Sequence, residues 1–423
     1  MNILLVGSGG REHALAWALS ASDLCDTLYC APGNAGIESC ATLVDLKDTD
    51  VDGLVQFAID NAINLVVIGP EAPLVAGLSD ALRAKGIDVF GPSQAAAQLE
   101  GSKGFMKDLC KEFDIPTAAY ERFTNIEKAE TYIRDMGAPI VIKADGLAAG
   151  KGVIVAMELD EALEAARDML SGNAFGDSGS SIVVEEFMDG EELSFFALAD
   201  GHGILPLTSA QDHKRAFDGD KGPNTGGMGA YSPARLMSQD LHDKIMTRII
   251  EPTVRGMKER GMPYTGVLYA GLMIVNGEPS LIEYNARFGD PECQVLMMRL
   301  QADLAEILQA GAQGRLSEIA DKVHWSEDVA MCVVMATNGY PQSYPKNTPI
   351  NGLDEANNSE GVVVFHAGTA KDGDQIVSIG GRVLGVTAKG ASVAEAQKRA
   401  YAAVDKIDWP DGFCRRDIGW RAL

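Results

Sequence analysis

Short apolar runs alternate with helical stretches over the first hundred residues of the chain. The runs Ile3–Val6, Thr27–Cys30, Leu65–Ile68 and Asp88–Phe90 are short, and each is followed closely by glycine or proline. Continuous apolar strands separated by helices are typical of a parallel sheet that is covered on both faces. The pattern predicts an N-terminal doubly wound parallel-sheet domain over residues 1–102. Ligands of such sheets bind at the carboxyl ends of the strands.

A glycine-rich hairpin is expected in the next part of the chain. The apolar segments Pro139–Lys143 and Val153–Ala156 read as strands, and Asp145–Gly152 between them is rich in glycine. A helix at about 160–170 and the apolar strand Ile182–Phe187 follow. We expect these elements to form a flap subdomain, mobile at its glycines, over residues about 120–190.

The central region as a whole, placed at residues 103–328, contains one long stretch without periodicity. Asp212–Pro233 consists of glycine, asparagine and charged residues with few apolar ones. A loop of that length inside a compact protein is usually functional or disordered. A helix at Leu241–Arg260 and strands at Val267–Val275 and Ser280–Asn285 are expected after it.

The last part of the chain, residues 329–423, has the pattern of a small α+β domain. Strands are expected at Val329–Ala336, Val362–Ala367 and Arg382–Thr387, and a helix at about Val393–Ile407. The overall expectation is therefore an α/β domain, a central domain with a flap, and a small C-terminal α+β domain.

Composition narrows the possible classes of function. The chain has 423 residues, enough for roughly three domains of about 150 residues each. Its net charge of −24 argues against a nucleic-acid partner, which needs a basic face, and against adsorption to anionic membranes. No apolar stretch approaches the roughly 20 residues of a membrane-spanning helix, and the N-terminus lacks the basic segment of a signal peptide. The seven cysteines are scattered without a CxxC pair, which favours a reduced cytoplasmic protein without a disulfide framework or zinc site.

The turn Gly7–His13 half-matches the dinucleotide-binding motif GxGxxG, with Glu12 at the place of the third glycine. The second strand does not end in the acidic residue that this motif uses for ribose, so a dinucleotide site is disfavoured. The turn can still offer N–H groups at a helix N-terminus to an anion, with Arg11 nearby. A plain tight turn between strand and helix is the structural alternative.

The segment Lys143–Gly152 is not a P-loop, because it lacks the four-residue spacing and the Ser/Thr after the lysine. Its glycines lie between two strands, where their backbone N–H groups can fold over phosphates as a nest. Lys143 at the end of an apolar strand would add positive charge, and Lys151 lies in the loop itself. A flexible surface hairpin is the alternative.

The strand that reads LIEYNAR carries the sharpest local signal. Glu283 and Asn285 share one face of a strand, and Arg287 joins them if the strand persists, whereas Ile282 and Tyr284 point to the other face. A carboxylate beside an amide oxygen suits Mg²⁺, which uses few protein ligands plus substrate phosphates. Arg287 would hold a phosphoryl oxygen during transfer. An exposed polar edge strand is the alternative.

The segment Val184–Ser194 has the pattern of a hinge. An apolar strand ends in backbone that can pair with an adenine edge, and a carboxylate a few residues later can accept ribose hydroxyls. A solvated acidic turn is the alternative for this pattern alone.

Together, the flap, the strand lysine, the hinge with a later glutamate and the E-x-N-x-R strand resemble the ATP-grasp superfamily in order and spacing. The chain is more narrowly similar to the phosphoribosylamine–glycine ligase family, the glycinamide ribonucleotide synthetases of purine biosynthesis. The similarity covers essentially the whole chain, in the segments GREHALAW, APGNAG, GPEAPL, QLEGSK, KADGLAAGKGV, QDHKR, GPNTGGMGAYSP and NARFGDPE.

The resemblance implies a ligase that joins glycine to 5-phosphoribosylamine. ATP would phosphorylate the glycine carboxylate to glycyl phosphate, and the amine would then displace phosphate to give glycinamide ribonucleotide and ADP. It also implies Mg²⁺ or Mn²⁺, small-molecule substrates, and a possible transient contact with the enzyme that supplies phosphoribosylamine. Catalysis of this kind needs positioning and charge neutralisation rather than a nucleophilic side chain.

The resemblance also assigns roles residue by residue. It implies metal ligands at Glu283 and Asn285, and a catalytic group at Arg287, Asp212 and Lys214. The implied ATP-binding residues are Lys103, Lys143, Gly150, Lys151, Gly152, Glu185, Phe187, Met188 and, for the ribose, Glu192. The implied residues for glycine and phosphoribosylamine are Gly9, Arg11, Asn34, Glu71, Gly226, Gly227, Met228 and Gly229.

One departure and three alternatives remain. Many ATP-grasp enzymes carry a further metal-binding acid on the strand before E-x-N, but Leu268–Ile274 contains none, so a complete second metal site is not expected. The alternatives are another ATP-grasp ligase or carboxylase, a nucleotide-binding regulatory protein without catalysis, and a dinucleotide-dependent oxidoreductase. Acceptor dependence of ATP turnover separates the first from the family named above.

Overall fold

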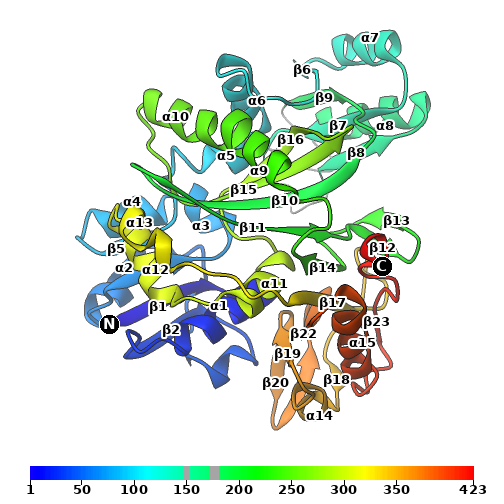
Figure 1. Cartoon of the computed structure of the whole chain (residues 1–423). Helices are drawn as coiled ribbons and strands as arrows, with labels where there is room; N and C mark the ends of the chain where they lie inside the picture. The colour runs from blue at the N-terminus through cyan, green and yellow to red at the C-terminus, as the bar shows by residue number, and fades with distance from the viewer. Residues whose placement is uncertain (147–151, 172–180) are drawn as a thin grey trace.

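The computed structural model describes residues 1–146, 152–171 and 181–423. Figure 1 shows the N-terminal part in blue at the lower left and the C-terminal part in orange and red at the lower right. Long green strands cross the middle of the molecule, and a small cyan layer lies at the upper right. The expected fold class is confirmed: a parallel N-terminal sheet, a central ATP-grasp-like antiparallel sheet with a smaller sheet beside it, and a C-terminal part.

The N-terminal sheet has five parallel strands in the order β3-β2-β1-β4-β5. Its inner strand is fully apolar and buried from Ile3 to Val6, because helices cover both faces. The strands are β1 (Asn2–Gly7), β2 (Thr27–Pro32), β3 (Thr42–Leu43), β4 (Leu65–Ile68) and β5 (Asp88–Phe90). The helices are α1 (Gly10–Ser20), α2 (Val51–Asp60), α3 (Glu71–Val75) and α4 (Leu78–Arg83).

The small layer is a four-stranded antiparallel sheet in the order β6-β9-β7-β8. It has its own apolar core with two helices, which is why it forms a separate layer. The strands are β6 (Tyr120–Phe123), β7 (Ile140–Ala144), β8 (Val153–Ala156) and β9 (Ile182–Glu186); the helices are α7 (Ile126–Met136) and α8 (Leu159–Leu170). The hairpin strands agree with the sequence, whereas the glycine turn at 147–151 lies outside the described residues.

The largest sheet runs in the order β16-β15-β10-β11-β14-β17-β22-β19, and β23 also pairs with β17. The C-terminal strands therefore extend the central sheet, because the short strand β14 pairs with β11 on one side and with β17 on the other. The sequence did not indicate this continuity. The strands are β10 (Glu191–Asp200), β11 (Ile204–Asp212), β14 (Gly229–Ser232), β15 (Thr265–Val275), β16 (Glu278–Asn285), β17 (Val329–Thr337), β19 (Val362–His366), β22 (Arg382–Gly390) and β23 (Gly412–Phe413).

The segment Asp212–Pro233 is more regular than its sequence suggests. It contains β14 and a two-stranded hairpin of β12 (Arg215–Phe217) and β13 (Lys221–Asn224). These strands are three or four residues long and rich in glycine and polar residues, so no periodicity marks them. β12 and β13 pair with each other, whereas β14 is determined by its pairing with the distant strands β11 and β17 rather than by local preference.

Helices link and cover the sheets. Gln239–Glu259 is helical throughout, as α9 (Gln239–Ile245), a π-helical turn (Met246–Ile250) and α10 (Glu251–Glu259), in agreement with the expected single helix. Every residue of α11 (Glu292–Arg299) is buried, and this helix contacts both α1 and β17. The other elements are α5 (Gln98–Gly101), α6 (Lys103–Glu112), α12 (Leu304–Ala312), α13 (Leu316–Ile319), β18 (Thr348–Ile350), α14 (Leu353–Asn357), β20 (Thr369–Asp372), β21 (Gln375–Ser378) and α15 (Val393–Val404).

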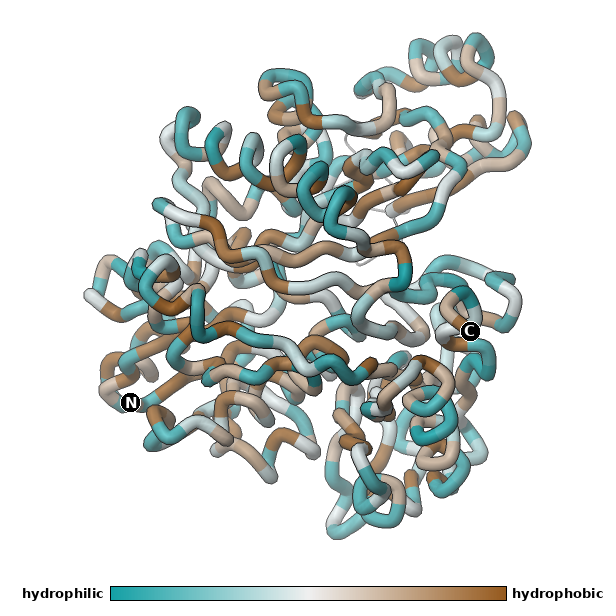
Figure 2. The backbone as a smooth tube through the Cα atoms, in the orientation of Figure 1, coloured by the Kyte–Doolittle hydropathy of each residue, from teal (hydrophilic) through white to brown (hydrophobic). Residues whose placement is uncertain are grey.

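Hydropathy follows this layering. Figure 2 shows brown segments along the strands in the interior and teal segments on the outer helices, such as α7. Among the described residues, no helix combines the length and the apolar character needed to cross a membrane.

Candidate active site

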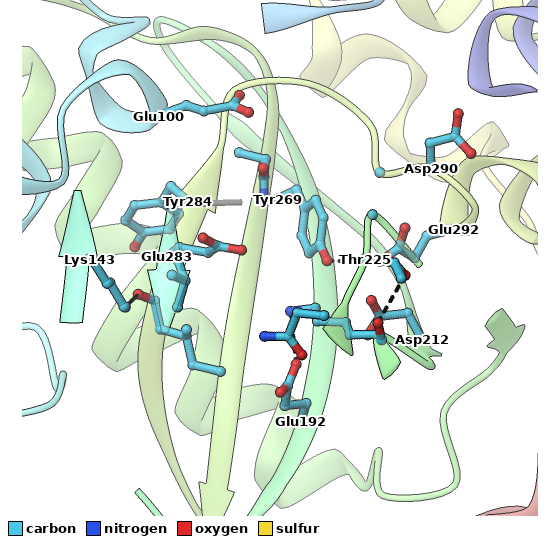
Figure 3. Close-up of a pocket in the computed structure, with 18 of the residues that line it drawn as sticks. Glu100, Lys143, Glu192, Asp212, Thr225, Tyr269, Glu283, Tyr284, Asp290 and Glu292 are labelled. Carbon is cyan, nitrogen blue, oxygen red and sulfur yellow. Dashed lines mark hydrogen bonds and ion pairs between the residues drawn. The ribbon is translucent and has the colours of Figure 1, made fainter. Parts of the chain in front are cut away.

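All three parts of the chain line one cavity of about 760 Å³. Figure 3 shows Glu283 on a central strand, with Lys143 on one side and Asp212 and Glu292 on the other. Most of the residues expected at a site meet here. Those that line the cavity are Gly9, Arg11, Glu71, Lys103, Lys143, Gly152, Glu185, Phe187, Met188, Glu192, Asp212, Lys214, Gly226, Glu283, Asn285 and Arg287.

The strand β16 presents Glu283 and Asn285 to the cavity. Glu283 pairs with Gly271 of β15 and Leu281 pairs with Leu272, so Ile282 lies in a β-bulge. The bulge breaks the alternation, and Ile282 lines the cavity although it was expected on the face opposite Glu283. Tyr284 is buried in the apolar core and also contributes to the cavity lining.

The electrostatic environment of Glu283 favours its ionised form. Burial alone would raise the pKa of this carboxyl group, but Lys214, Lys143, Lys103 and Arg287 outweigh burial and lower the pKa. A carboxylate among four cations is suited to hold a metal ion together with the phosphates of a nucleotide.

Lys143 takes part in a buried charge cluster. Its Nζ lies 2.9 Å from Glu185 Oε2 and donates a hydrogen bond to the Ile282 carbonyl oxygen at 3.1 Å. Lys107 Nζ of α6 lies 3.2 Å from the same Glu185 oxygen and donates to Thr117 Oγ1 at 2.8 Å. Glu185 Oε1 is buried and has no hydrogen-bond partner among the residues described. The cluster leaves one acceptor oxygen of Glu185 for a ligand.

Lys103 lies at the first position of α6 and contacts the base of the flap hairpin. Ser102 caps this helix by accepting the N–H of Phe105, and Lys103 Nζ donates to the Gly146 carbonyl oxygen at 3.0 Å. Burial lowers the pKa of Lys103, against the opposing effect of Glu283. The two lysines expected to contact phosphates thus both line the cavity, Lys143 on β7 of the flap and Lys103 on α6.

The hinge follows β9 directly, with Phe187 and Met188 at the cavity. Glu192, on the next strand, is half exposed and forms an ion pair with Lys214, Nζ to Oε2, at 2.8 Å. This ion pair joins the residue expected at the ribose to one expected at the reacting centre.

Arg287 is held by two carboxylates. Its Nη2 lies 2.8 Å from Glu100 Oε1 and its Nε lies 3.2 Å from Glu71 Oε2. Burial raises the pKa of Glu100 to about 7, with Arg287 opposing this effect. Burial alone would raise the pKa of Glu71 as well, but Arg287 and Arg11 lower it. Sequence reasoning missed Glu100, although it lies in the QLEGSK segment.

A second group of buried polar side chains faces Glu283 across the cavity. Tyr269 OH donates to Glu292 Oε1 at 2.8 Å, and Ser194 Oγ donates to the same oxygen at 3.2 Å. Asp212, at the end of β11, is 8% exposed, and burial raises its pKa to about 8. Sequence reasoning missed Glu292 and Tyr269, because Glu292 lies on α11 while Tyr269 and Ser194 lie on strands β15 and β10, far apart in the chain.

The turn before α1 differs from the expected anion site. The Gly9 N–H donates to Glu12 Oε2 at 2.6 Å and the Arg11 N–H donates to Asp290 Oδ2 at 3.2 Å. Arg11 Nε lies 2.5 Å from Glu12 Oε1. Glutamate three residues after the N-cap is a capping-box position, so this cap was readable in the sequence. Carboxylates already bind these N–H groups, and the geometry does not favour an anion there.

The C-terminal part contributes Arg382, which sequence reasoning missed. Its Nη1 donates to the carbonyl oxygens of Asp290, Gly226 and Gly227, at 2.6, 2.8 and 3.2 Å. One guanidinium group thus fixes the glycine loop after β13 to the segment after β16.

Some expected residues are not brought to the cavity. Asn34 Nδ2 donates to the carbonyl oxygens of Ser8 and His366, and its Oδ1 accepts the N–H of Gly36, so Asn34 joins backbone segments. Gly227, Met228 and Gly229 also lie outside the cavity lining, although Gly226 is part of it. Gly150 and Lys151 fall outside the described residues.

The residues present fit a divalent cation with few protein ligands. Within 1–146, 152–171 and 181–423, no group of three or more His, Cys, Asp or Glu residues is arranged to hold a metal ion. On β15, Gly271 and Tyr269 lie opposite Glu283 and Asn285, where a further acid would otherwise stand. The donor set is therefore one carboxylate and one amide, which leaves the other positions for phosphate and water.

The three parts of the chain match three family descriptions. Residues 1–100 match the phosphoribosylglycinamide synthetase N domain, 101–293 its ATP-grasp (A) domain, and 330–421 its C domain. The chain belongs to the phosphoribosylglycinamide synthetase family.

Relatives in this family are similar over the whole chain. The phosphoribosylamine–glycine ligase of Agrobacterium fabrum is 61% identical over 423 residues, which is 100% of this chain and 99% of that protein. The ligase of Brucella melitensis is 59% identical over 423 residues, 100% of this chain and 98% of that protein. The chloroplastic ligase of Arabidopsis thaliana is 58% identical, over 98% of this chain and 79% of that protein.

Solved structures agree with the family's fold. Phosphoribosylamine–glycine ligase from Thermotoga maritima has a TM-score of 0.86 and 32% identity, and the match covers 99% of this chain and 100% of that one. Biotin carboxylase from Campylobacter jejuni has a TM-score of 0.75 at 15% identity, over 98% of this chain and 93% of that one, which indicates a shared fold.

Proposed function

We propose that this chain is an ATP-dependent ligase that joins glycine to 5-phosphoribosylamine. The products are glycinamide ribonucleotide, ADP and phosphate, in de novo purine biosynthesis. Membership of the family and relatives of this name at 59–61% identity over the whole chain support the assignment. The observation that carries it is Glu283 with Asn285 among Lys103, Lys143, Lys214 and Arg287 at one cavity.

The proposed route passes through glycyl phosphate. A carboxylate oxygen of glycine attacks the γ-phosphorus of ATP, and ADP leaves. The amine of phosphoribosylamine then attacks the carbonyl carbon, the C–N bond forms, and phosphate leaves with the former carboxylate oxygen. Cations arranged around the transferring group stabilise its charge without a covalent intermediate on the protein.

Each substrate has a proposed place. Glu283 and Asn285 would hold Mg²⁺, with Mn²⁺ as a substitute, and Lys103 and Lys143 would neutralise ATP phosphates next to that ion. Glu185, Phe187 and Met188 suit adenine, because all three line the cavity and Glu185 Oε1 has no hydrogen-bond partner in the described part of the chain.

Phosphoribosylamine is proposed to enter from the N-terminal side, where Glu71 lines the cavity beside Arg287. The amine suits a carboxylate such as Glu71. Because this substrate is labile, a transient contact with the enzyme that supplies it is part of the proposal. A cytoplasmic location is proposed as well, where ATP is available and the seven cysteines remain free thiols.

Phosphate release by the purified protein tests the assignment. Mg-ATP is supplied with glycine, phosphoribosylamine made in situ from ribose 5-phosphate and ammonia, or both. We expect turnover only when both acceptors are present. Turnover with another carboxylate in place of glycine, or independence of phosphoribosylamine, would assign the chain to another ATP-grasp reaction.

A further inference from the structure

The carboxylate of Asp212 lies in the cavity without a hydrogen-bond or ion-pair partner among the described residues. Its side chain is 8% exposed and lines the cavity, yet within the described part of the chain it forms no hydrogen bond or ion pair. The neighbouring Glu292 differs, because it accepts hydrogen bonds from Tyr269 and Ser194. A buried carboxylate without a donor is costly, so the position is suited to a ligand that supplies donors.

The surroundings of Asp212 indicate the charge of that ligand. Glu292, Glu192 and Glu283 all act on Asp212 as like charges, and Lys214 acts as the opposite charge. Asp212 is the last residue of β11 and Lys214 follows two residues later, and both line the cavity. A carboxylate beside a lysine complements a small zwitterion, whose ammonium faces Asp212 and whose carboxylate faces the cations.

We propose that Asp212 binds the α-ammonium group of the glycine substrate and thereby selects an amino acid over other small carboxylates. This inference rests on the proposed ligase function and deepens it. Lys214 and Arg287 would hold the other end of glycine, next to the phosphate that the carboxylate attacks. The ligand is thus bound by three charged groups that all line the cavity.

This arrangement has a chemical consequence for the reaction. An ammonium group has no lone pair, so glycine held in this form cannot attack a second activated carboxylate. The amine of phosphoribosylamine, bound elsewhere, is then the nucleophile that forms the C–N bond as phosphate leaves. The ammonium group favours the ionised form of Asp212, against the effect of burial on its pKa. The proton that the attacking nitrogen loses leaves with the phosphate.

A metal ion is the competing occupant. Among the residues that the structure describes, no three carboxylate, imidazole or thiolate groups come together at a metal site. An ammonium group carries one charge and donates three hydrogen bonds, which suits a single carboxylate better.

Steady-state kinetics of Asp212→Asn tests the proposal. The amide keeps the shape and removes the charge; Asp52→Asn, on the exposed side of α2, is the matched control. We expect the glycine KM to rise about 100-fold in Asp212→Asn, because a buried charged pair is lost. Acetate, which lacks the ammonium group, is titrated as an inhibitor competing with glycine. Its inhibition constant should change little, so that the preference for glycine over acetate collapses.

Other results would overturn the proposal. These are an unchanged glycine KM, an equal loss of glycine and acetate binding, or a higher Mg²⁺ requirement in Asp212→Asn. If the variant fails to fold, the same ligands are compared on the wild-type protein. Acetate or N-acetylglycine that binds as tightly as glycine contradicts the inference. N-methylglycine, which keeps the ammonium group, should bind more tightly than acetate and N-acetylglycine, and this result supports the inference. Failure of the wild-type protein to ligate glycine would instead remove the proposed function itself.

Discussion

At the scale of single residues, charge balance determines what the cavity can bind. Glu283 is surrounded by four cations, and three of these are themselves held in place: Lys143 by Glu185, Lys214 by Glu192, and Arg287 by Glu71 and Glu100. Such pairs orient the cations before a nucleotide arrives. Preorganised charge is the main source of rate enhancement in phosphoryl transfer.

Glu283→Gln should abolish ligation, because the amide cannot supply the charge that a divalent cation requires. We expect kcat to fall on the order of 1,000-fold, as for loss of one preorganised charge at a transition state. Glu278→Gln is the matched control: it lies on the same strand, exposed, and pairs with Lys244 at 2.9 Å. Similar losses in both variants would show that β16 tolerates no change and that Glu283 has no special role.

Glu100→Gln should change the pH dependence of stability. Burial raises the pKa of Glu100 from its ordinary 4.5 to about 7, so the folded protein holds this proton more tightly than the unfolded chain does. The stability due to protonation is complete below pH 4.5 and is lost as the pH rises through 7. Relative to Glu100→Gln, the wild-type free energy of unfolding should fall by roughly 3 kcal/mol over that window.

Urea unfolding at a series of pH values measures this effect for the wild type and Glu100→Gln. Glu121→Gln, exposed on β6, serves as control, and its profile should run parallel to that of the wild type. If the free energy of unfolding of Glu100→Gln changes with pH in the same way as that of the wild type, the assigned environment of Glu100 is contradicted.

At the scale of elements, two local features place the reacting groups. The β-bulge at Ile282 turns Glu283 into the cavity, and the N-terminus of α6 carries Lys103 to the base of the flap. The sequence predicts both strands of this region, β15 and β16, but it does not predict the bulge at Ile282. A one-residue irregularity leaves hydrophobicity almost unchanged, so only the pairing with Gly271 reveals it.

Lys107→Met should destabilise the contact between α6 and β9. Lys107 is fully buried, and its loss would leave Glu185 with Lys143 as its one cation in the described residues. Removing one partner of a buried ion pair lowers the free energy of unfolding by about 3 kcal/mol or more, because the other charge stays buried without compensation. Urea denaturation should show this loss, whereas Lys111→Met, exposed on the same helix, should remain near wild type. Equal stability of both variants would mean that the buried pair contributes nothing.

At the scale of the whole molecule, the active site depends on all three parts of the chain. The fold class and the position of the E-x-N strand could be predicted, because apolar periodicity and motif spacing are local properties of the sequence. The continuity of the central and C-terminal strands through β14 could not be predicted. Three of the four residues of β14 are small or polar, so the strand shows no apolar pattern. Arg382 and Glu292 were missed for the same reason: their partners are far away in the chain.

Arg382→Ala tests whether the C-terminal part takes part in the site. Loss of three hydrogen bonds to carbonyl oxygens should loosen the loop at Gly226 and lower kcat/KM for glycine about 10- to 100-fold. The Mg-ATP affinity should change little, because Arg382 contacts no residue of the flap hairpin in the described structure. Arg416→Ala, exposed in the same part of the chain, is the control. An unaffected kcat/KM in Arg382→Ala would limit the C-terminal part to a packing role.

Oxygen transfer tests the central claim most directly. Glycine labelled with ¹⁸O in its carboxylate is supplied with Mg-ATP and phosphoribosylamine, and the products are examined by mass spectrometry. The account predicts glycinamide ribonucleotide, ADP, and one ¹⁸O atom in each phosphate released, because the carboxylate oxygen leaves with the phosphoryl group. Unlabelled phosphate, or label in AMP, would contradict activation of glycine as an acyl phosphate at Glu283.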